Sequence, residues 1–290
     1  MTSETEREIA SQPGVWRRAA ALASGAPGLP ARGERVAAVG CGTSWFMAQA
    51  YAALREEGGH GETDAFTATE FPRGRSYDRV VAISRSGTTT EVARLLGELD
   101  APVTAITAVG GTPVPDAAAH AIVLDFADER SVVQTRFATS VLALLRAHLG
   151  HDLEPAARDA EIALGTPPLH DVDRFDHHVF LGHGWTIGLA SEAALKLREA
   201  AQAHTEAYPA MEYRHGPVSL AGPTSLVWIL GTPDPTVVAD IEATGATVHM
   251  GSLDPMAELV LVQARAIALA AARGLDPDHP RHLTRSVVLT

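Results

Sequence analysis

A dense cluster of hydroxyl side chains occupies residues 84–89, in the run Ser-Arg-Ser-Gly-Thr-Thr, directly after an apolar stretch. Where a strand turns into a helix, the first backbone amides lack intrahelical partners and the helix dipole favours negative charge, so such a turn can bind an anion. A single serine or threonine there is commonly only a helix cap. The density of hydroxyls instead favours a phosphate site in this segment, which we call the hydroxyl loop. Its donors would be Ser84, Ser86, Thr88 and Thr89.

A second turn, Gly-Cys-Gly-Thr-Ser at residues 40–44, would present Thr43 and Ser44 to the same ligand. No Gly-Lys-Ser follows the hydroxyl loop, which excludes a nucleotide P-loop. A dinucleotide-binding fingerprint would need a third glycine and an acidic residue after the next strand. That pattern is not convincingly present, so a dinucleotide-dependent oxidoreductase is disfavoured.

Lysine occurs once, at Lys196, although lysine and arginine together number 23. Glu192, Lys196 and Glu199 are spaced at i, i+4 and i+7, which places them on one face of a helix. A surface ion-pair ladder is one interpretation, but arginine would serve that purpose equally well. A compact ammonium group beside a carboxylate would instead hold Glu199 as a base and stabilise a developing enolate.

The segment that follows, residues 204–217, is polar, aromatic and rich in turn-forming residues. His215 precedes Gly-Pro and is predicted to lie in a loop, where a histidine is usually only solvated. His204 and Glu206 are close enough in sequence to pair, but their spacing is not a zinc-ligand signature. We therefore expect no catalytic metal and no cofactor.

The elements that must position these residues alternate between strands and helices, which indicates a parallel sheet covered on both faces. In the first half, strands are predicted at residues 35–40, 79–84, 102–107 and 121–124. Helices are predicted at residues 45–54, 90–99 and 132–149.

The second half repeats this order, because a strand, a Gly-x-Gly turn and a helix begin near residue 178 as they do near residue 36. Further strands are predicted at residues 225–230 and 244–250, and a long apolar helix at 257–273. We therefore predict an α/β fold of two tandem domains, residues 1–155 with an N-terminal helix and residues 156–290 with a C-terminal tail. The join is placed at residues 150–173, which are rich in proline and acidic residues.

The composition of the 290-residue chain excludes several classes of protein. With 35 acidic and 23 basic side chains its net charge is −12, which disfavours binding to the phosphates of DNA or RNA. The single cysteine, Cys41, excludes an internal disulfide framework. The start of the chain is polar and acidic, unlike a secretory signal, and no apolar run is expected to be long enough to span a membrane. A cytoplasmic protein without nucleic-acid or membrane partners is the resulting expectation.

Taken together and in order, these motifs resemble the double sugar-isomerase (SIS) domain family, whose flavodoxin-like domains are parallel sheets flanked by helices. More closely, the chain resembles the isomerase half of glucosamine-6-phosphate synthase and the stand-alone hexosamine-phosphate isomerases and deaminases. The synthase's glutamine-hydrolysing domain and its nucleophilic cysteine have no counterpart here, so glutamine is not the expected nitrogen donor. The matching segments begin at Cys41, Ser84, Glu192, Glu206, His215 and Pro280.

The resemblance implies a role for each candidate residue. Glu199 would be the base that moves a proton at carbon 2 of the sugar, and Lys196 would lie beside it. His215 would assist ring opening in the neighbouring subunit of a homodimer with shared active sites. Residues 281–290 would fold over the site as an active-site tail. The residues implied to contact the sugar phosphate are Thr43, Ser44, Ser84, Arg85, Ser86, Thr89, Glu129 and Arg285.

One position departs from the family pattern. Arg285 stands where the synthase has a tail lysine that forms a Schiff base with fructose 6-phosphate, and a guanidinium group stays protonated and cannot serve as that amine. The expected function is therefore proton abstraction at carbon 2 of a ring-opened glucosamine or N-acetylglucosamine 6-phosphate, giving isomerisation, deamination or dehydration. The alternative is a non-catalytic sugar-phosphate sensor, which needs the hydroxyl loop but no base.

Overall fold

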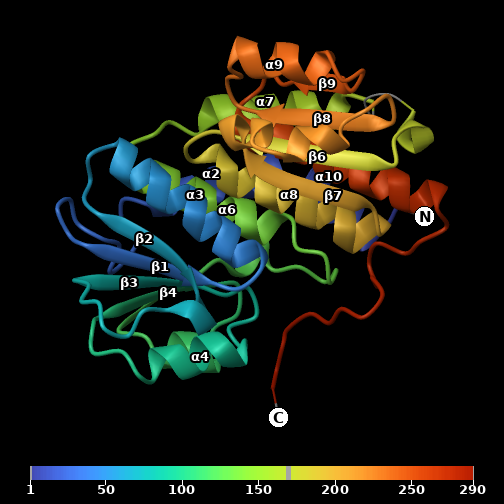
Figure 1. The fold of residues 1–290 in the computed structure, drawn as a ribbon. Coiled ribbons are helices and arrows are strands. Elements are labelled where there is room, and N and C mark those ends of the chain that lie inside the picture. Colours follow the sequence, from blue (N-terminus) through green and yellow to red (C-terminus); the bar gives the residue numbers. More distant parts are fainter. Residues whose placement is uncertain (1, 168–170, 290) are drawn as a thin grey trace. The chain divides into compact units, whose positions relative to one another are not determined.

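The computed structural model describes residues 2–167 and 171–289, which form two compact units (Figure 1). The five-strand unit consists of residues 14–130, 134–154 and 284–289. The four-strand unit consists of residues 2–13, 131–133, 155–167 and 171–283. Each unit contains one parallel sheet flanked by helices, which confirms the predicted fold class.

In the five-strand unit the sheet has the order β2-β1-β3-β4-β5, with every neighbouring pair parallel. The strands are β1 (Val36–Gly40), β2 (Thr63–Thr67), β3 (Arg79–Ile83), β4 (Val103–Thr107) and β5 (His120–Val123). The helices are α2 (Gln12–Leu22), α3 (Thr43–Glu57), α4 (Thr90–Leu96), α5 (Pro113–Asp116) and α6 (Arg136–His148). Strands β1 and β4 are buried at every residue, because helices on both faces of a parallel sheet leave its central strands no exposed side.

The four-strand unit has the sheet order β7-β6-β8-β9, again with parallel neighbours. The strands are β6 (His177–Gly182), β7 (His204–Pro209), β8 (Ser225–Leu230) and β9 (Thr247–Met250). The helices are α1 (Glu4–Ala10), α7 (Glu154–Gly165), α8 (Thr186–Ala201), α9 (Pro235–Glu242) and α10 (Pro255–Ala272). Helix α8 packs against β6, β7 and α10, and this packing buries one face of the helix that carries Lys196.

Strand β2 (Thr63–Thr67) has no predicted counterpart, and the segments 150–173 and 204–217 also differ from the sequence-based expectation. The predicted join at residues 150–173 contains helix α7, whose alanines at 156, 157, 160 and 163 form a buried face with helical spacing. Positions 168–170 of that join lie outside the described residues. The turn-rich segment 204–217 begins with strand β7, a half-buried edge strand paired with β6. The alternation of polar and apolar residues in β7 is short, and turn-forming residues after it obscured the strand signal.

Helix α10 corrects the expectation that no apolar run reaches the length of a membrane span. Its 18 residues are long and apolar enough for a span by length and composition alone. Most of the helix is buried within the four-strand unit, and it packs against α8 and α1. The core helix of a folded protein meets the same criterion, because a helix buried on all sides is apolar all round.

The two ends of the chain do not follow the predicted domain ranges 1–155 and 156–290. Residues 2–13 belong to the four-strand unit, and residues 284–289 belong to the five-strand unit. The start of α1 is held by the carboxylate of Asp278 within the four-strand unit. Asp278 accepts hydrogen bonds from the backbone amides of Glu4 and Thr5, both at 2.8 Å, and from the Thr5 hydroxyl at 2.6 Å. These contacts could not be read from local sequence patterns, because they join residues more than 270 positions apart.

A buried histidine in β6 predicts how the stability of the protein depends on pH. The His178 side chain is fully buried, and neither ring nitrogen has a hydrogen-bond partner among the described residues. Burial and then the nearby charge of Arg265 lower the pKa of His178 from 6.5 to about 3, because both disfavour the imidazolium form. As the pH falls below 6.5, the unfolded chain therefore binds a proton that the folded chain does not.

We expect the free energy of unfolding to decrease between pH 7 and pH 5 by about 2 kcal/mol more in the wild type than in His178→Phe. Urea unfolding at both pH values measures this difference. His279→Phe is the matched control, because the His279 side chain is 82% exposed and its removal should leave the wild-type pH dependence in place. An equal pH dependence in the wild type and in His178→Phe would contradict this prediction.

Candidate functional site

The hydroxyl loop lies at the carboxyl edge of the five-strand sheet. Strand β3 ends at Ile83, the loop follows, and α4 begins at Thr90. The neighbouring strand β1 is parallel to β3 and leads into the second turn, so Thr43 and Ser44 lie at the same edge. In parallel α/β sheets, this is the edge at which ligands bind.

The loop is tightly built around its hydroxyl groups. The hydroxyls of Ser84 and Thr89 lie 3.2 Å apart, and the Ser86 hydroxyl accepts hydrogen bonds from the amide and hydroxyl of Thr88 at 3.2 and 2.9 Å. Gly87 has φ +65°, and a Cβ atom there would lie 2.0 Å from the Thr112 hydroxyl. Glycine is therefore required at this turn, and the loop has little freedom to change its shape.

The C-terminal tail contacts this loop within the same unit. The Ser286 hydroxyl lies 3.0 Å from that of Ser86 and 2.9 Å from that of Thr88. The backbone amide of Thr90 donates to the carbonyl of Val287 at 3.2 Å, and the amide of Leu289 donates to the Thr90 hydroxyl at 2.9 Å. The tail thus accepts hydrogen bonds from the Ser86 hydroxyl and the Thr90 amide, which are donors that a phosphate at this turn would use.

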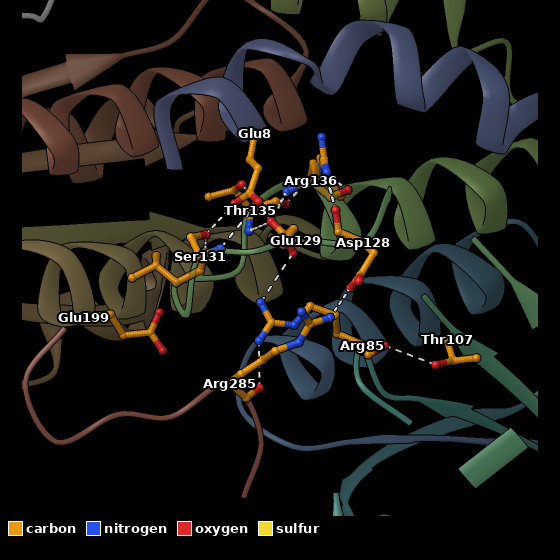
Figure 2. A network of polar contacts seen from close by, with 12 residues as sticks. Glu8, Arg85, Thr107, Asp128, Glu129, Ser131, Thr135, Arg136, Glu199 and Arg285 are labelled. Atoms are coloured by element: carbon orange, nitrogen blue, oxygen red, sulfur yellow. Dashed lines mark hydrogen bonds and ion pairs between the residues drawn. The ribbon is translucent and has the colours of Figure 1, made fainter. Parts of the chain in front are cut away.

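Three of the predicted substrate contacts, Arg85, Glu129 and Arg285, form one polar network, which is buried at Arg85 and Glu129 and exposed at Arg285 (Figure 2). The Arg85 guanidinium lies 3.9 Å from the Glu129 carboxylate and donates to the carbonyl of Arg285 at 2.7 Å. The Arg285 side chain pairs with Asp128. Arg85 and Glu129 are buried, so the charge of each is compensated inside the unit. The sequence did not single out Asp128, because a lone aspartate in a loop carries no pattern.

Glu129 also has a structural role. One of its carboxylate oxygens accepts hydrogen bonds from the amide and hydroxyl of Thr135 at 2.5 and 2.9 Å and from the amide of Arg136 at 2.8 Å. These groups lie at the start of α6, where amides are unpaired and a negative charge is favoured. In this structure Glu129 therefore caps a helix and faces Arg85.

In the four-strand unit, Lys196 forms an ion triad with Glu192 and Glu199 on helix α8. The Lys196 ammonium lies 2.5 Å from the Glu199 carboxylate and 3.3 Å from the Glu192 carboxylate. The side chains of Lys196 and Glu192 are each 1% exposed, and that of Glu199 is 20% exposed. The surface-ladder interpretation is therefore wrong. The triad reaches solvent mainly through Glu199.

The Glu199 side chain lines a pocket of about 270 Å³ in the four-strand unit. The pocket is lined by Leu195, Arg198, Glu199, Gln202, Arg281, His282 and Leu283. A carboxylate that is held by a buried ammonium and exposed to a pocket can accept a proton from a bound molecule. The sequence motifs pointed to Glu199 but not to His282, because no periodic pattern connects the tail to α8.

The remaining histidine candidates lie apart from the triad's contacts. His215 is exposed in a turn before Gly216, and within residues 2–167 and 171–289 no hydrogen bond or ion pair links its side chain to the triad. Glu206 pairs with His177 at 3.2 Å rather than with His204. Among the described residues, no group of three or more His, Cys, Asp or Glu side chains is arranged to hold a metal ion.

Comparison with known proteins identifies relatives over most of the chain. No family model matches it. Glutamine–fructose-6-phosphate aminotransferase of Gloeobacter violaceus is 28% identical over 88% of this chain and 52% of its own length. The chain thus spans about half the length of the curated relatives it matches.

Two solved structures share the fold across nearly the whole chain. The crystal structure of a glucosamine-6-phosphate deaminase from Thermotoga maritima has a TM-score of 0.84 and 25% identity, and the match covers 99% of this chain and 100% of the other. The C-terminal domain of the glucosamine-fructose-6-phosphate aminotransferase from Francisella tularensis has a TM-score of 0.78 and 20% identity. That match covers 97% of this chain and 99% of the other.

Proposed function

Because this chain is a sugar-isomerase (SIS) domain protein, homologous to the isomerase domain of glutamine–fructose-6-phosphate aminotransferase, we propose that it is an enzyme acting on an amino-sugar 6-phosphate. The observation that carries the catalytic part of the proposal is the buried Lys196, which holds Glu199 at 2.5 Å beside a pocket. A fixed carboxylate at a pocket suits the general base that this chemistry requires. The hydroxyl loop is assigned to the phosphate, and Thr43 and Ser44 assist it.

The proposed chemistry begins with the open-chain aldose. Glu199 accepts the proton from carbon 2, the carbon 1–carbon 2 double bond forms, and the electrons of the carbonyl move to oxygen 1. The ammonium of Lys196 stabilises the charge that develops. Return of a proton to carbon 1, with transfer of a proton from the nitrogen to oxygen 1, then leaves carbon 2 double-bonded to its nitrogen, which is the imine of the ketose.

The substituent on nitrogen decides the final product. A free amine leaves a ketimine, which water hydrolyses to fructose 6-phosphate and ammonia. An acetylated nitrogen cannot leave in this way, so the enolate instead re-forms the carbonyl at carbon 1, the carbon 2–carbon 3 double bond forms, and the hydroxyl of carbon 3 leaves as water with the proton that Glu199 had accepted. Arg285 supplies no amine for Schiff-base capture of a ketose, and we therefore place the aldose first. The proposal includes a homodimer in which His215 assists ring opening in the neighbouring subunit.

Incubation with the 6-phosphates of glucosamine, N-acetylglucosamine and fructose tests this function. Mass spectrometry and an ammonia assay follow the products. Release of ammonia from glucosamine 6-phosphate or loss of one water from the acetylated sugar supports the proposal and identifies the reaction. Tight binding of a sugar phosphate without any turnover would contradict it and favour a sensor.

Replacement of Ser84 and Ser86 by alanine should weaken binding of phosphorylated sugars selectively. Hydrogen bonds to a charged group contribute about 1.5–3 kcal/mol each, so the double variant should lose about 10²-fold or more in affinity. Titration calorimetry with glucosamine 6-phosphate and with glucosamine measures the difference. Thr69→Ala, which removes an exposed hydroxyl of the same unit, is the control. An equal loss for both sugars would show that the loop does not bind phosphate.

A further inference from the structure

The pocket beside Glu199 holds a second group capable of proton transfer. His282 lines the same pocket of about 270 Å³. Ligand pockets typically measure about 300–1,000 Å³, so this space is of the size that a small molecule occupies. Glu199 is the only carboxylate and His282 the only imidazole among the lining residues of this pocket.

Two residues with left-handed backbone line the pocket; Gln202 owes this conformation to its place as the C-cap of α8, whereas His282 lies in no helix. Gln202 has φ +52° and His282 has φ +65°, and they are the only residues other than glycine with a positive φ in the part of the chain that the structure describes. Both line this pocket. A side chain in the left-handed region costs free energy, and such residues cluster at functional sites.

The charges around His282 suit a developing enolate. Arg198 and Glu199 face the pocket from α8, and Arg281 faces it from the tail segment that carries His282. The two guanidinium groups stay protonated and attract negative charge, but they cannot give up a proton at neutral pH. Histidine is a common general acid in catalysis, and His282 is the histidine among the lining residues.

We propose that His282 is the catalytic general acid that donates a proton to oxygen 1 of the substrate while Glu199 removes the proton from carbon 2. This inference rests on the proposed function. The carbon 2–hydrogen bond breaks and its proton goes to Glu199, the carbon 1–carbon 2 double bond forms, and the carbonyl electrons take the proton of the imidazolium at oxygen 1. The product of the step is the neutral enol, and the imidazole regains its proton from solvent. This step differs from ring opening, which is assigned to His215.

Two variants of His282 test the assignment without imposing new backbone strain. Asparagine tolerates a positive φ and glycine adopts it freely. In His282→Asn, turnover of glucosamine 6-phosphate and exchange of its carbon-2 proton with solvent deuterium should both fall by about 10²–10⁴-fold. The alkaline limb of the pH–rate profile should also disappear, because such a limb reports an essential general acid.

Rescue by added imidazole distinguishes a catalytic role of His282 from a structural one. Imidazole added to His282→Gly should restore part of the turnover, whereas it should leave His282→Asn and the wild type unchanged. His279→Asn is the matched control, because His279 lies three residues earlier, is 82% exposed and pairs with Asp276 outside the pocket. This control should keep the wild-type rate and pH profile.

The outcomes distinguish this inference from the proposed function. If the wild type turns over glucosamine 6-phosphate and His282→Asn keeps both its rate and its alkaline limb, the assignment of His282 is overturned and the function stands. If the wild type neither turns over nor exchanges any of the three sugar phosphates, the proposed function fails and the assignment fails with it. Loss of the rate and limb in His282→Asn, with rescue of His282→Gly by imidazole, supports both.

Discussion

The Glu199→Gln variant should show no detectable exchange of the carbon-2 proton with solvent deuterium, and its turnover should fall by about 10²–10⁴-fold. The amide has nearly the shape of the carboxylate but cannot accept a proton at neutral pH. The fold should survive, because the Lys196 ammonium keeps the Glu192 carboxylate at 3.3 Å. Proton NMR of glucosamine 6-phosphate in deuterium oxide measures the exchange directly, independently of which product forms.

Glu192→Gln is the matched control for this experiment. Both carboxylates contact the same ammonium, but only Glu199 lines the pocket. Glu192→Gln should therefore retain exchange, at a rate altered only through the charge of Lys196. Exchange that survives in Glu199→Gln and disappears in Glu192→Gln would assign the base to Glu192 and contradict the assignment of Glu199.

The sequence predicted the fold well where strands were long and apolar. Each buried strand of the two sheets except the edge strands β2 and β7 corresponds to an apolar run between turn-forming residues. Strands β2 and β7 contain no run of more than two consecutive apolar residues and therefore give weak patterns, whereas the other two edge strands, β5 and β9, were predicted. Helix α7 was missed for a different reason, because its buried face consists of alanines and its proline and acidic residues are typical of a linker.

The candidate site was predictable only in part. Spacing placed Glu192, Lys196 and Glu199 on one helix face, but helical periodicity does not show whether a charged face is buried. Burial depends on α8 packing against β6, β7 and α10, which are distant in sequence. The hydroxyl loop was visible because its residues are contiguous. Its contacts with Ser286 and Val287 join residues about 200 positions apart and have no sequence signature.

The Lys196→Met variant should lose both stability and activity, and a second substitution should restore only the stability. Methionine keeps an unbranched stem but removes the ammonium from beside two carboxylates, one of them 1% exposed. Removing one partner of a buried ion pair costs about 3–5 kcal/mol. The double variant Lys196→Met/Glu192→Gln no longer buries that carboxylate, so its free energy of unfolding should return toward the wild-type value. Turnover should stay low in both variants, because Glu199 has lost the group that orients it.

Lys196→Arg distinguishes charge from shape at the same position. A guanidinium group keeps the positive charge but is larger and planar, and enlarging a side chain at a fully buried position usually forces neighbouring side chains to move. We therefore expect substantial loss of turnover even where urea unfolding shows a folded protein. Sodium borohydride added with substrate should trap no adduct in the wild type, because Lys196 acts through its charge and Arg285 cannot form an imine. A trapped adduct on Lys196 would instead make it a Schiff-base lysine, and near-wild-type turnover in Lys196→Arg would show that the triad serves only the fold.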